Sequence, residues 1–166
     1  LNTPSNVAAF RTALLAWYRA NKRSLGWRDI DNPYHVWISE IMLQQTRVDQ
    51  MDAYFTRFIA RFPALVDLAV AQESDVLKVW EGLGYYARAR NMHKAAQLMV
   101  TQHEGRIPDS YEELIALPGI GTYTAAAVSS IAFDRDHAVL DGNVVRVLCR
   151  LLRICLLYTS PSPRDF

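Results

Sequence analysis

Two acidic residues, Glu40 and Asp141, lie among apolar neighbours and are candidates for acid–base chemistry. Glu40 falls in the middle of a predicted helix. Its neighbours are bulky and apolar: Ile38, Ile41, Met42 and Leu43. An acid in this setting either faces solvent or serves a function, because an unpaired carboxylate is costly to bury. Asp141 belongs to the run LDGNV, in which the amide Asn143 follows it closely.

A second candidate site is the tight loop Leu117-Pro118-Gly119-Ile120-Gly121, which a helix rich in small residues follows at once. Two glycines two apart let the backbone turn sharply and expose successive N–H groups. The unpaired N-terminal donors and the positive dipole end of the next helix point the same way. The loop is therefore predicted to bind an anion without a cationic side chain. Taken alone, it also suits a plain helix–turn–helix corner.

The elements that must position these residues are helices, because the apolar residues recur at helical spacing and no strand-like alternation of useful length appears. We expect an all-α chain of about eight or nine short helices. The expected helices span residues 6–21, 33–50, 51–61, 67–71, 74–81, 88–102, 111–116, 122–133 and 144–154. Pro33 suits the first turn of its helix.

Composition limits the function classes less than the motifs do. The 166 residues fit one domain, or one domain and a fragment, and the net charge of +1 does not by itself indicate nucleic-acid binding. The two cysteines, Cys149 and Cys155, match no zinc or disulfide framework, which favours reduced intracellular thiols and no metal site. No apolar run reaches the roughly 18 residues of a membrane span. The chain starts at Leu1 rather than Met, so its true N-terminus can be missing.

Three runs together resemble the helix–hairpin–helix DNA glycosylases, and within them the MutY-type adenine glycosylases. The runs are WISEIMLQQTRV at 37–48, WEGLGYYARARNMHKAA at 80–96, and LPGIGTYTAAAV with LDGNVVRVL within 117–148. The resemblance covers nearly all of residues 5–154. Endonuclease III-type members carry a lysine nucleophile where this chain has Tyr123, so no Schiff-base lyase chemistry is expected.

The resemblance implies removal of adenine mispaired with 8-oxoguanine or guanine, after the nucleotide is flipped out of the duplex. It gives Glu40 the role of protonating adenine N7 and then assisting water, since a carboxylic acid in an apolar setting can hold its proton near neutral pH. It gives Asp141 the role of the anion beside the sugar cation, as in glycosidases. Asn143 and Tyr123 are expected to line the same site.

The resemblance also implies residues that hold DNA. Gln44 and Tyr85 would enter the base stack, although an aromatic at a glycine turn also suits packing or a surface ring. Gly119, Ile120 and Gly121 would offer N–H groups to a phosphate, with a monovalent cation bound by hairpin carbonyls. Three basic residues are candidate phosphate contacts or a solvated face: Arg88, Arg90 and Lys94. The predicted base pocket consists of Trp27, Arg28 and Leu43.

Family features are also missing. The family holds a [4Fe–4S] cluster with four cysteines spaced C-x6-C-x2-C-x5-C, and its ligands are absent from this chain. The resemblance implies a six-helix barrel module at 33–134, carrying a helix–hairpin–helix at about 111–133. Residues 1–32 and 135–154 would form a partial second, iron–sulfur module. The tail at 155–166 loses the helical period and resembles a translated sequencing adapter; a native flexible C-terminus is the alternative, which the nucleotide sequence decides.

Two other functions stay open: a glycosylase of this fold with another base preference, such as thymine in mismatches, and a non-catalytic DNA-binding module. The acid at position 40 argues against the binding module, which has no need of it. The expected partner is double-stranded DNA containing A:8-oxoG or A:G mispairs, with no membrane. The protein is expected to be a cytoplasmic bacterial monomer that acts on nucleoid DNA. The fragment itself is expected to be inactive.

Overall fold

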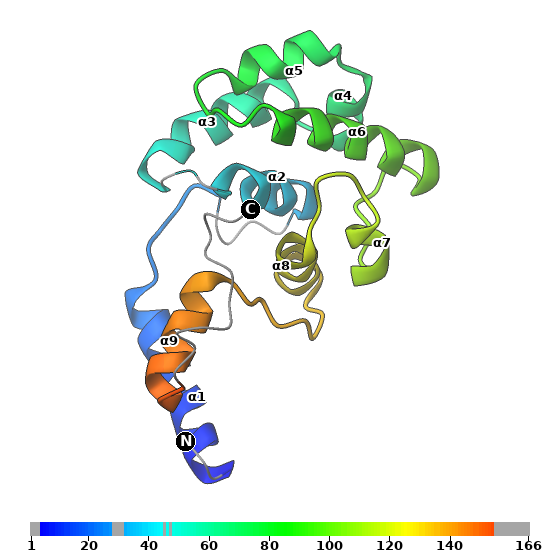
Figure 1. Cartoon of the computed structure of the whole chain (residues 1–166). Helices are drawn as coiled ribbons and strands as arrows, with labels where there is room; N and C mark the ends of the chain where they lie inside the picture. Colours follow the sequence, from blue (N-terminus) through cyan, green and yellow to red (C-terminus); the bar gives the residue numbers. More distant parts are fainter. Residues whose placement is uncertain (1–3, 28–31, 45, 47, 155–166) are drawn as a thin grey trace. The chain divides into compact units, whose positions relative to one another are not determined.

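The computed structural model describes residues 4–27, 32–44, 46 and 48–154 (Figure 1), and all regular structure within them is helical. The helices are α1 (Pro4–Asn21), α2 (Pro33–Leu43), α3 (Val48–Arg61), α4 (Leu65–Val70), α5 (Glu73–Trp80), α6 (Ala87–Gln102), α7 (Tyr111–Ile115), α8 (Thr122–Phe133) and α9 (Gly142–Leu152). The all-α prediction is confirmed. The tail at 155–166 lies outside the described residues.

The sequence predicts one helix from Pro33 to Gln50, and this prediction is wrong because the helix is shorter. Helix α2 ends at Leu43, and Gln44 has left the helical conformation with φ −58° and ψ 112°. A separate helix, α3, begins at Val48. The start is as expected: the Asn32 side chain accepts the Tyr34 N–H at 3.0 Å, and Pro33 occupies the first turn.

The chain divides into two compact units. Unit 1 combines Leu1–Ser24 with Leu140–Phe166, and unit 2 is Leu25–Val139. Helices α1 and α9 belong to unit 1, and α2 to α8 belong to unit 2. The predicted barrel module at 33–134 and the partial iron–sulfur module stay predictions.

Helix α2 is the centre of unit 2. It runs between the group α3 to α6 and the pair α7 and α8 (Figure 1). Its side chains Trp37, Ile38 and Met42 are fully buried. They join one apolar cluster with Phe58 of α3 and Trp80 of α5. The helix that carries Glu40 is therefore held on several sides by the core.

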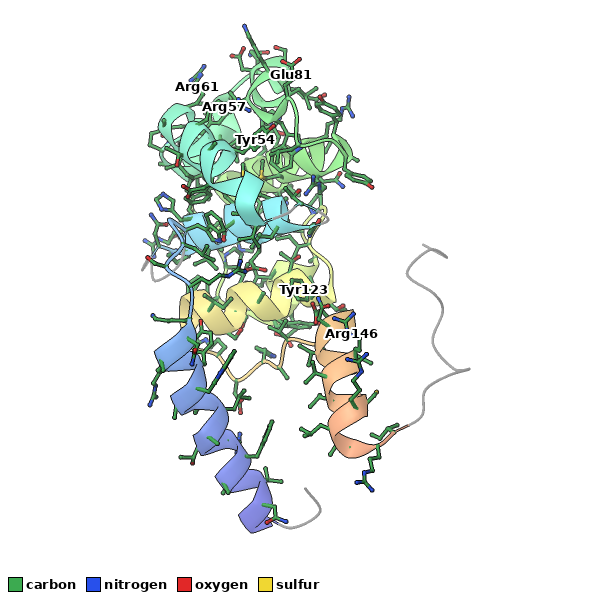
Figure 2. The ribbon with its side chains drawn as sticks, turned by 90° about the vertical axis from the view of Figure 1, so that its left-hand side faces the viewer. Tyr54, Arg57, Arg61, Glu81, Tyr123 and Arg146 are labelled. Atoms are coloured by element: carbon green, nitrogen blue, oxygen red, sulfur yellow. The ribbon has the colours of Figure 1, made fainter. Side chains whose placement is uncertain are left out.

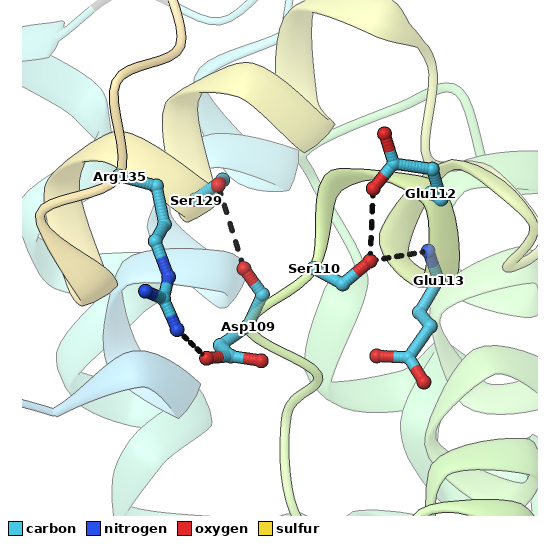
Figure 3. A network of polar contacts seen from close by, with 6 residues as sticks. All are labelled: Asp109, Ser110, Glu112, Glu113, Ser129 and Arg135. Carbon is cyan, nitrogen blue, oxygen red and sulfur yellow. Dashed lines mark hydrogen bonds and ion pairs between the residues drawn. The ribbon is translucent and has the colours of Figure 1, made fainter.

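Polar contacts fix the two arms of the hairpin formed by α7 and α8 (Figure 3). The Ser110 hydroxyl accepts the Glu113 N–H at 3.3 Å and so caps α7. The Asp109 side chain pairs with Arg135, which follows α8. The Asp109 carbonyl oxygen accepts a hydrogen bond from the Ser129 hydroxyl at 3.5 Å. These contacts join the start of one arm to the end of the other.

Unit 1 has no buried side chain among its described residues. The apolar residues of α1 and α9 follow helical spacing, as predicted, but none of the described ones is buried and most are exposed. The large exposed ones are Val7, Leu14, Leu15, Trp17, Tyr18, Val144, Val147, Leu148, Leu151 and Leu152. The two helices therefore lack a core of their own within the part of the chain that the structure describes.

Within the described residues, no helix is both long enough and apolar enough to cross a membrane.

Candidate functional site

Glu40 is half-buried near the C-terminal end of α2. Its neighbours in the helix, Ser39 and Ile41, are each 3% exposed. Glu40 is therefore neither fully solvated nor fully buried, and its catalytic role stays a prediction.

Gln44 directly follows the last residue of α2, and its side chain connects α2 to the hairpin. Its side-chain Nε2 donates to the Thr124 Oγ1 at 3.1 Å. Thr124 is buried and lies in the first turn of α8, next to Tyr123. Tyr123 itself is 37% exposed, so its ring reaches the surface of unit 2 (Figure 2). The residue predicted to enter the base stack is thus tied to the helix that follows the phosphate-binding loop.

The turn between α5 and α6 holds Tyr85 outward. Gly82 and Gly84 have φ of 95° and 68°, and Tyr85 has a φ of 46°, which is strained for a residue with a side chain. The Tyr85 ring is 65% exposed. The Trp80 Nε1–H donates to the Gly84 carbonyl oxygen at 3.0 Å and supports the turn from within. A strained, exposed aromatic held by its surroundings is typical of a binding residue rather than of packing.

The base of this turn is also held from α3 (Figure 2). The Arg57 guanidinium donates to the carbonyl oxygens of Val79 and Glu81, at 2.8 and 3.2 Å, and lies over the Tyr54 ring. At Gly82 an added Cβ would lie 2.4 Å from the Tyr54 hydroxyl. Only glycine fits there, so the sequence GLGYY is matched to this packing.

Arg88 folds back onto backbone carbonyl groups. Its Nη1 donates to Ile41 and Met42 at 3.0 and 3.1 Å and also to Gln44. Its Nη2 donates to Leu83 and Gly84 at 3.2 and 3.4 Å. Burial lowers the pKa of the guanidinium from its usual value. Its predicted contact with a DNA phosphate stays a prediction.

In the loop between α7 and α8, some backbone N–H groups are hydrogen-bonded within the loop and others have no partner within the helix. Gly119 has a φ of 75°, and an added Cβ would lie 2.7 Å from the Asn91 Cβ. The Ile120 N–H donates to the Leu117 carbonyl oxygen at 3.2 Å, and the Ile120 side chain is buried. Gly121 is the N-cap residue of α8, so the first N–H groups of that helix have no partner within the helix. Phosphate binding by Gly119, Ile120 and Gly121 stays a prediction.

Substituting the two glycines separately tests this geometry. Gly119→Ala is expected to lower the free energy of unfolding by about 2 kcal/mol, because a left-handed conformation and a close Cβ contact both oppose it. Gly121→Ala is the matched control, with a φ of −90° and open space around the new Cβ, so a loss of about 0.5 kcal/mol is expected. Urea unfolding of both variants gives the comparison. Equal losses would contradict it.

The predicted base pocket is described only in part. Trp27 is 6% exposed and packs against Phe55, with ring centroids 6.3 Å apart. Leu43 is partly buried against the core. Arg28 lies outside the described residues. Trp27 therefore serves the core of unit 2, and contact of Trp27 or Leu43 with a base stays a prediction.

Asp141 and Asn143 lie at the start of α9, in unit 1. The Asp141 Oδ1 accepts the Val144 N–H at 2.7 Å, and Oδ2 accepts the Asn143 Nδ2–H at 3.1 Å. The Val144 bond, aided by the Asn143 amide, lowers the pKa of the Asp141 carboxyl from its usual value. Arg146, labelled in Figure 2, donates to the Asn143 Oδ1 at 2.9 Å. The result is a fixed, ionised carboxylate held by a helix N-terminus.

Residues 38–155 match the family model of the HhH-GPD superfamily base excision DNA repair proteins. The chain belongs to this superfamily. Curated relatives called adenine DNA glycosylase are 45% identical in Mus musculus and 44% identical in Buchnera aphidicola subsp. Baizongia pistaciae, over 90% and 87% of this chain. The chain spans 31% and 42% of those two relatives.

Solved structures agree with the HhH-GPD fold. A thermostable thymine-DNA glycosylase superposes with a TM-score of 0.79 at 28% identity, over 85% of this chain and 65% of that one. A non-covalent endonuclease III–DNA complex has a TM-score of 0.75 at 23% identity, over 92% of this chain and 72% of that one. The predicted helix–hairpin–helix glycosylase fold is confirmed.

The residues of this HhH-GPD chain do not fit a [4Fe–4S] cluster. The sequence has two cysteines where such a cluster takes four ligands. Among the described residues, no group of three or more His, Cys, Asp or Glu side chains is placed to hold a metal ion.

Sequence reasoning placed Glu40, Gln44, Tyr85 and Tyr123 in the site, and all four lie in unit 2 of this HhH-GPD chain. It missed Thr124 as the partner of Gln44 and Trp80 as a support of the Tyr85 turn. Thr124 gave a weak signal, as a hydroxyl in an otherwise small and apolar helix. Trp80 gave none, because a tryptophan before a glycine turn suits simple packing equally well.

Proposed function

We propose that the full-length protein is an adenine DNA glycosylase that hydrolyses the N-glycosidic bond of adenine mispaired with 8-oxoguanine or guanine. The observation that carries the proposal is the half-buried Glu40 in the same unit as the exposed Tyr85 and the α7–α8 loop. An acid, a base-stack wedge and an anion-binding loop are the parts that base excision needs. Relatives called adenine DNA glycosylase, at 44–45% identity, support the choice of adenine.

Catalysis begins when Glu40 donates a proton to adenine N7. The bond between N9 and the sugar C1′ then breaks, its electron pair stays on adenine, and adenine leaves as a neutral base. The carboxylate of Asp141 stabilises the positive charge that develops on the sugar. Water adds to C1′ and gives its proton to the Glu40 carboxylate, which restores the acid and leaves an abasic site. Tyr123 in place of a lysine supports hydrolysis without a covalent intermediate.

Binding uses the other parts of the site. Gln44 and Tyr85 fill the space that the flipped nucleotide leaves in the base stack. Gly119, Gly121 and the α8 N-terminus hold a phosphate, with a monovalent cation on the hairpin carbonyls. Trp27, Arg28 and Leu43 are proposed to surround the extruded adenine. The partner is double-stranded DNA.

The deciding experiment uses the full-length gene product, because the chain spans 31–42% of the relatives cited. Single-turnover release of bases is measured on duplexes with A:8-oxoG, A:G and T:G pairs. Adenine release opposite 8-oxoguanine is expected to be fastest. Faster release of thymine would overturn the adenine assignment and favour the second candidate, a thymine mismatch enzyme, to which the thymine-DNA glycosylase likeness points. Binding without any release would indicate a DNA-binding module.

The 166-residue chain alone is expected to release adenine at least about a hundredfold more slowly than the full-length protein, because a misplaced catalytic group costs about that much. Unit 1 carries Asp141 but has no buried side chain among its described residues. Limited proteolysis should therefore cut α1 and α9 first and leave 25–139 protected. Equal rates for the two proteins, or equal protection of the two units, would contradict this expectation.

A further inference from the structure

Arg88 joins two separate segments of unit 2 through one guanidinium group. Nη1 donates to the carbonyl groups of Ile41 and Met42 at the end of α2 and of its C-cap residue Gln44. Nη2 donates to Leu83 and Gly84 in the turn before α6. The two nitrogens thus face different segments, and the fixed fork of the guanidinium sets the distance between them.

Each of these segments carries one of the side chains that the proposed function inserts into the base stack. Gln44 is the C-cap residue of α2, and its own carbonyl oxygen is an acceptor of Arg88. Tyr85 directly follows Gly84, another acceptor, and the Arg88 guanidinium carbon lies 5.6 Å from the centre of the Tyr85 ring. The same group lies 5.2 Å from the centre of the buried Trp80 ring.

We infer that Arg88 is a positioning residue: it joins the Gln44 end of α2 to the Tyr85 turn, so that both side chains enter the DNA at a fixed spacing. This inference rests on the proposed function. This role differs from the predicted phosphate contact, because Nη1 and Nη2 already donate to carbonyl oxygens inside the protein. Without it, Tyr85 loses a support for its unfavourable φ of 46°, and the end of α2 loses its partner.

Arg88→Lys separates the two roles. Lysine keeps the charge, so a phosphate contact would survive. It cannot reach both segments with separate nitrogens, so the connection between α2 and the turn would be lost. The assay uses the full-length gene product and a duplex with 2-aminopurine opposite 8-oxoguanine, because the fluorescence of this adenine analogue rises when it leaves the stack. Base release from A:8-oxoG is measured under single turnover, and binding is measured as a function of salt.

The expected result for Arg88→Lys is a loss of most of the fluorescence rise and a fall of about a hundredfold in the single-turnover rate. The slope of log affinity against log salt should stay unchanged in Arg88→Lys and in Arg88→Gln. A normal fluorescence rise in Arg88→Lys overturns the inference. So does a salt slope that is smaller by about 0.9 in Arg88→Gln and restored in Arg88→Lys, since this is the mark of one phosphate contact.

A control variant separates positioning from stability. Met99→Ala removes a fully buried side chain far along α6, so it lowers stability while leaving Arg88 in place. At temperatures below the melting temperature of the variant protein, Met99→Ala should unstack the analogue normally. If Arg88→Lys fails to fold, Arg88→Gln takes its place, since its single amide group cannot donate to both segments either. It should reduce the fluorescence rise, and a normal rise overturns the inference.

Unstacking is measured without cleavage, so the inference and the proposed function fail separately. A wild-type protein that unstacks the analogue but releases no adenine overturns the proposed function and leaves the role of Arg88 intact. A wild-type protein that releases adenine, with an Arg88→Lys variant that does so equally well, overturns the role of Arg88 alone.

Discussion

Replacing Glu40 with glutamine in the full-length protein is expected to abolish adenine release and to leave DNA binding intact. Glutamine keeps the shape of the side chain and can still form hydrogen bonds, but its amide N–H is far too weak an acid to protonate N7. One carboxyl group acts as acid and then as base in the proposed mechanism, so the single-turnover rate should fall by at least about 10⁴-fold. Because Glu40 is half-buried on a helix held by the core, we expect this exchange to leave the backbone unchanged.

The control is Glu81→Gln, which removes an exposed carboxylate of unit 2 with no assigned role in the chemistry. Its rate and affinity should match those of the wild type. Fluorescence anisotropy with a labelled A:8-oxoG duplex gives the affinities, and thermal melting checks the fold of both variants. A Glu40→Gln protein that still releases adenine would refute the role given to Glu40.

Asp141→Asn is expected to slow adenine release by about 10²- to 10³-fold with little change in stability. Asparagine caps a helix about as well as aspartate, so its Oδ1 can still accept the Val144 N–H. Only the negative charge beside the proposed sugar cation is lost. If Asp141 serves α9 merely as an N-cap, the same variant should work normally.

Asp136→Asn is the matched control, because it removes an exposed acid close by in the sequence. Single-turnover rates and melting temperatures of both variants are compared with those of the wild type. A rate for Asp141→Asn equal to that of Asp136→Asn would contradict a catalytic role. A large drop in its melting temperature would also contradict the expectation, since it would mean that the charge matters more to the fold than to the reaction.

The acidic limb of the pH profile should not come from Asp141. Its pKa is lowered in the folded protein by the Val144 N–H, so this carboxylate stays ionised to a lower pH than an ordinary aspartate. The same shift stabilises the fold above the unfolded pKa, and this stability is lost as pH falls through the folded pKa. In Asp141→Asn this acid-induced loss of stability should be smaller, which melting curves against pH can measure.

Local rules predicted the hairpin well, because it depends on local chemistry. The bounds of α8, Thr122–Phe133, are those that the sequence indicates, since Gly121 and the small residues define them without help from distant parts. The predicted end of α2 was wrong because that end depends on contacts with distant residues. Gln44 has no intrinsic tendency to stop a helix, and carbonyl groups bound by Arg88 from far along the chain lie at this end.

The candidate site divides in the same way. The acid at position 40 is recognisable from its apolar neighbours, and its half-burial agrees with them. That Arg88 turns inward could not be read from the sequence, because a basic residue in the first turn of a helix more often faces water. The apolar faces of α1 and α9 have the predicted spacing, yet they are exposed, since spacing shows which face can pack but not whether a partner is present.

The hydrogen bond between Gln44 and Thr124 joins residues that are 80 positions apart. Such a contact carries a large loop-closure entropy, so it is expected to form late in folding. During synthesis, a growing chain that has already made α2 and the Tyr85 turn still lacks α8, which anchors Gln44. If the proposed function holds, the ability to open a duplex should therefore arrive only when the last part of unit 2 has left the ribosome, and a partly made chain should not distort DNA.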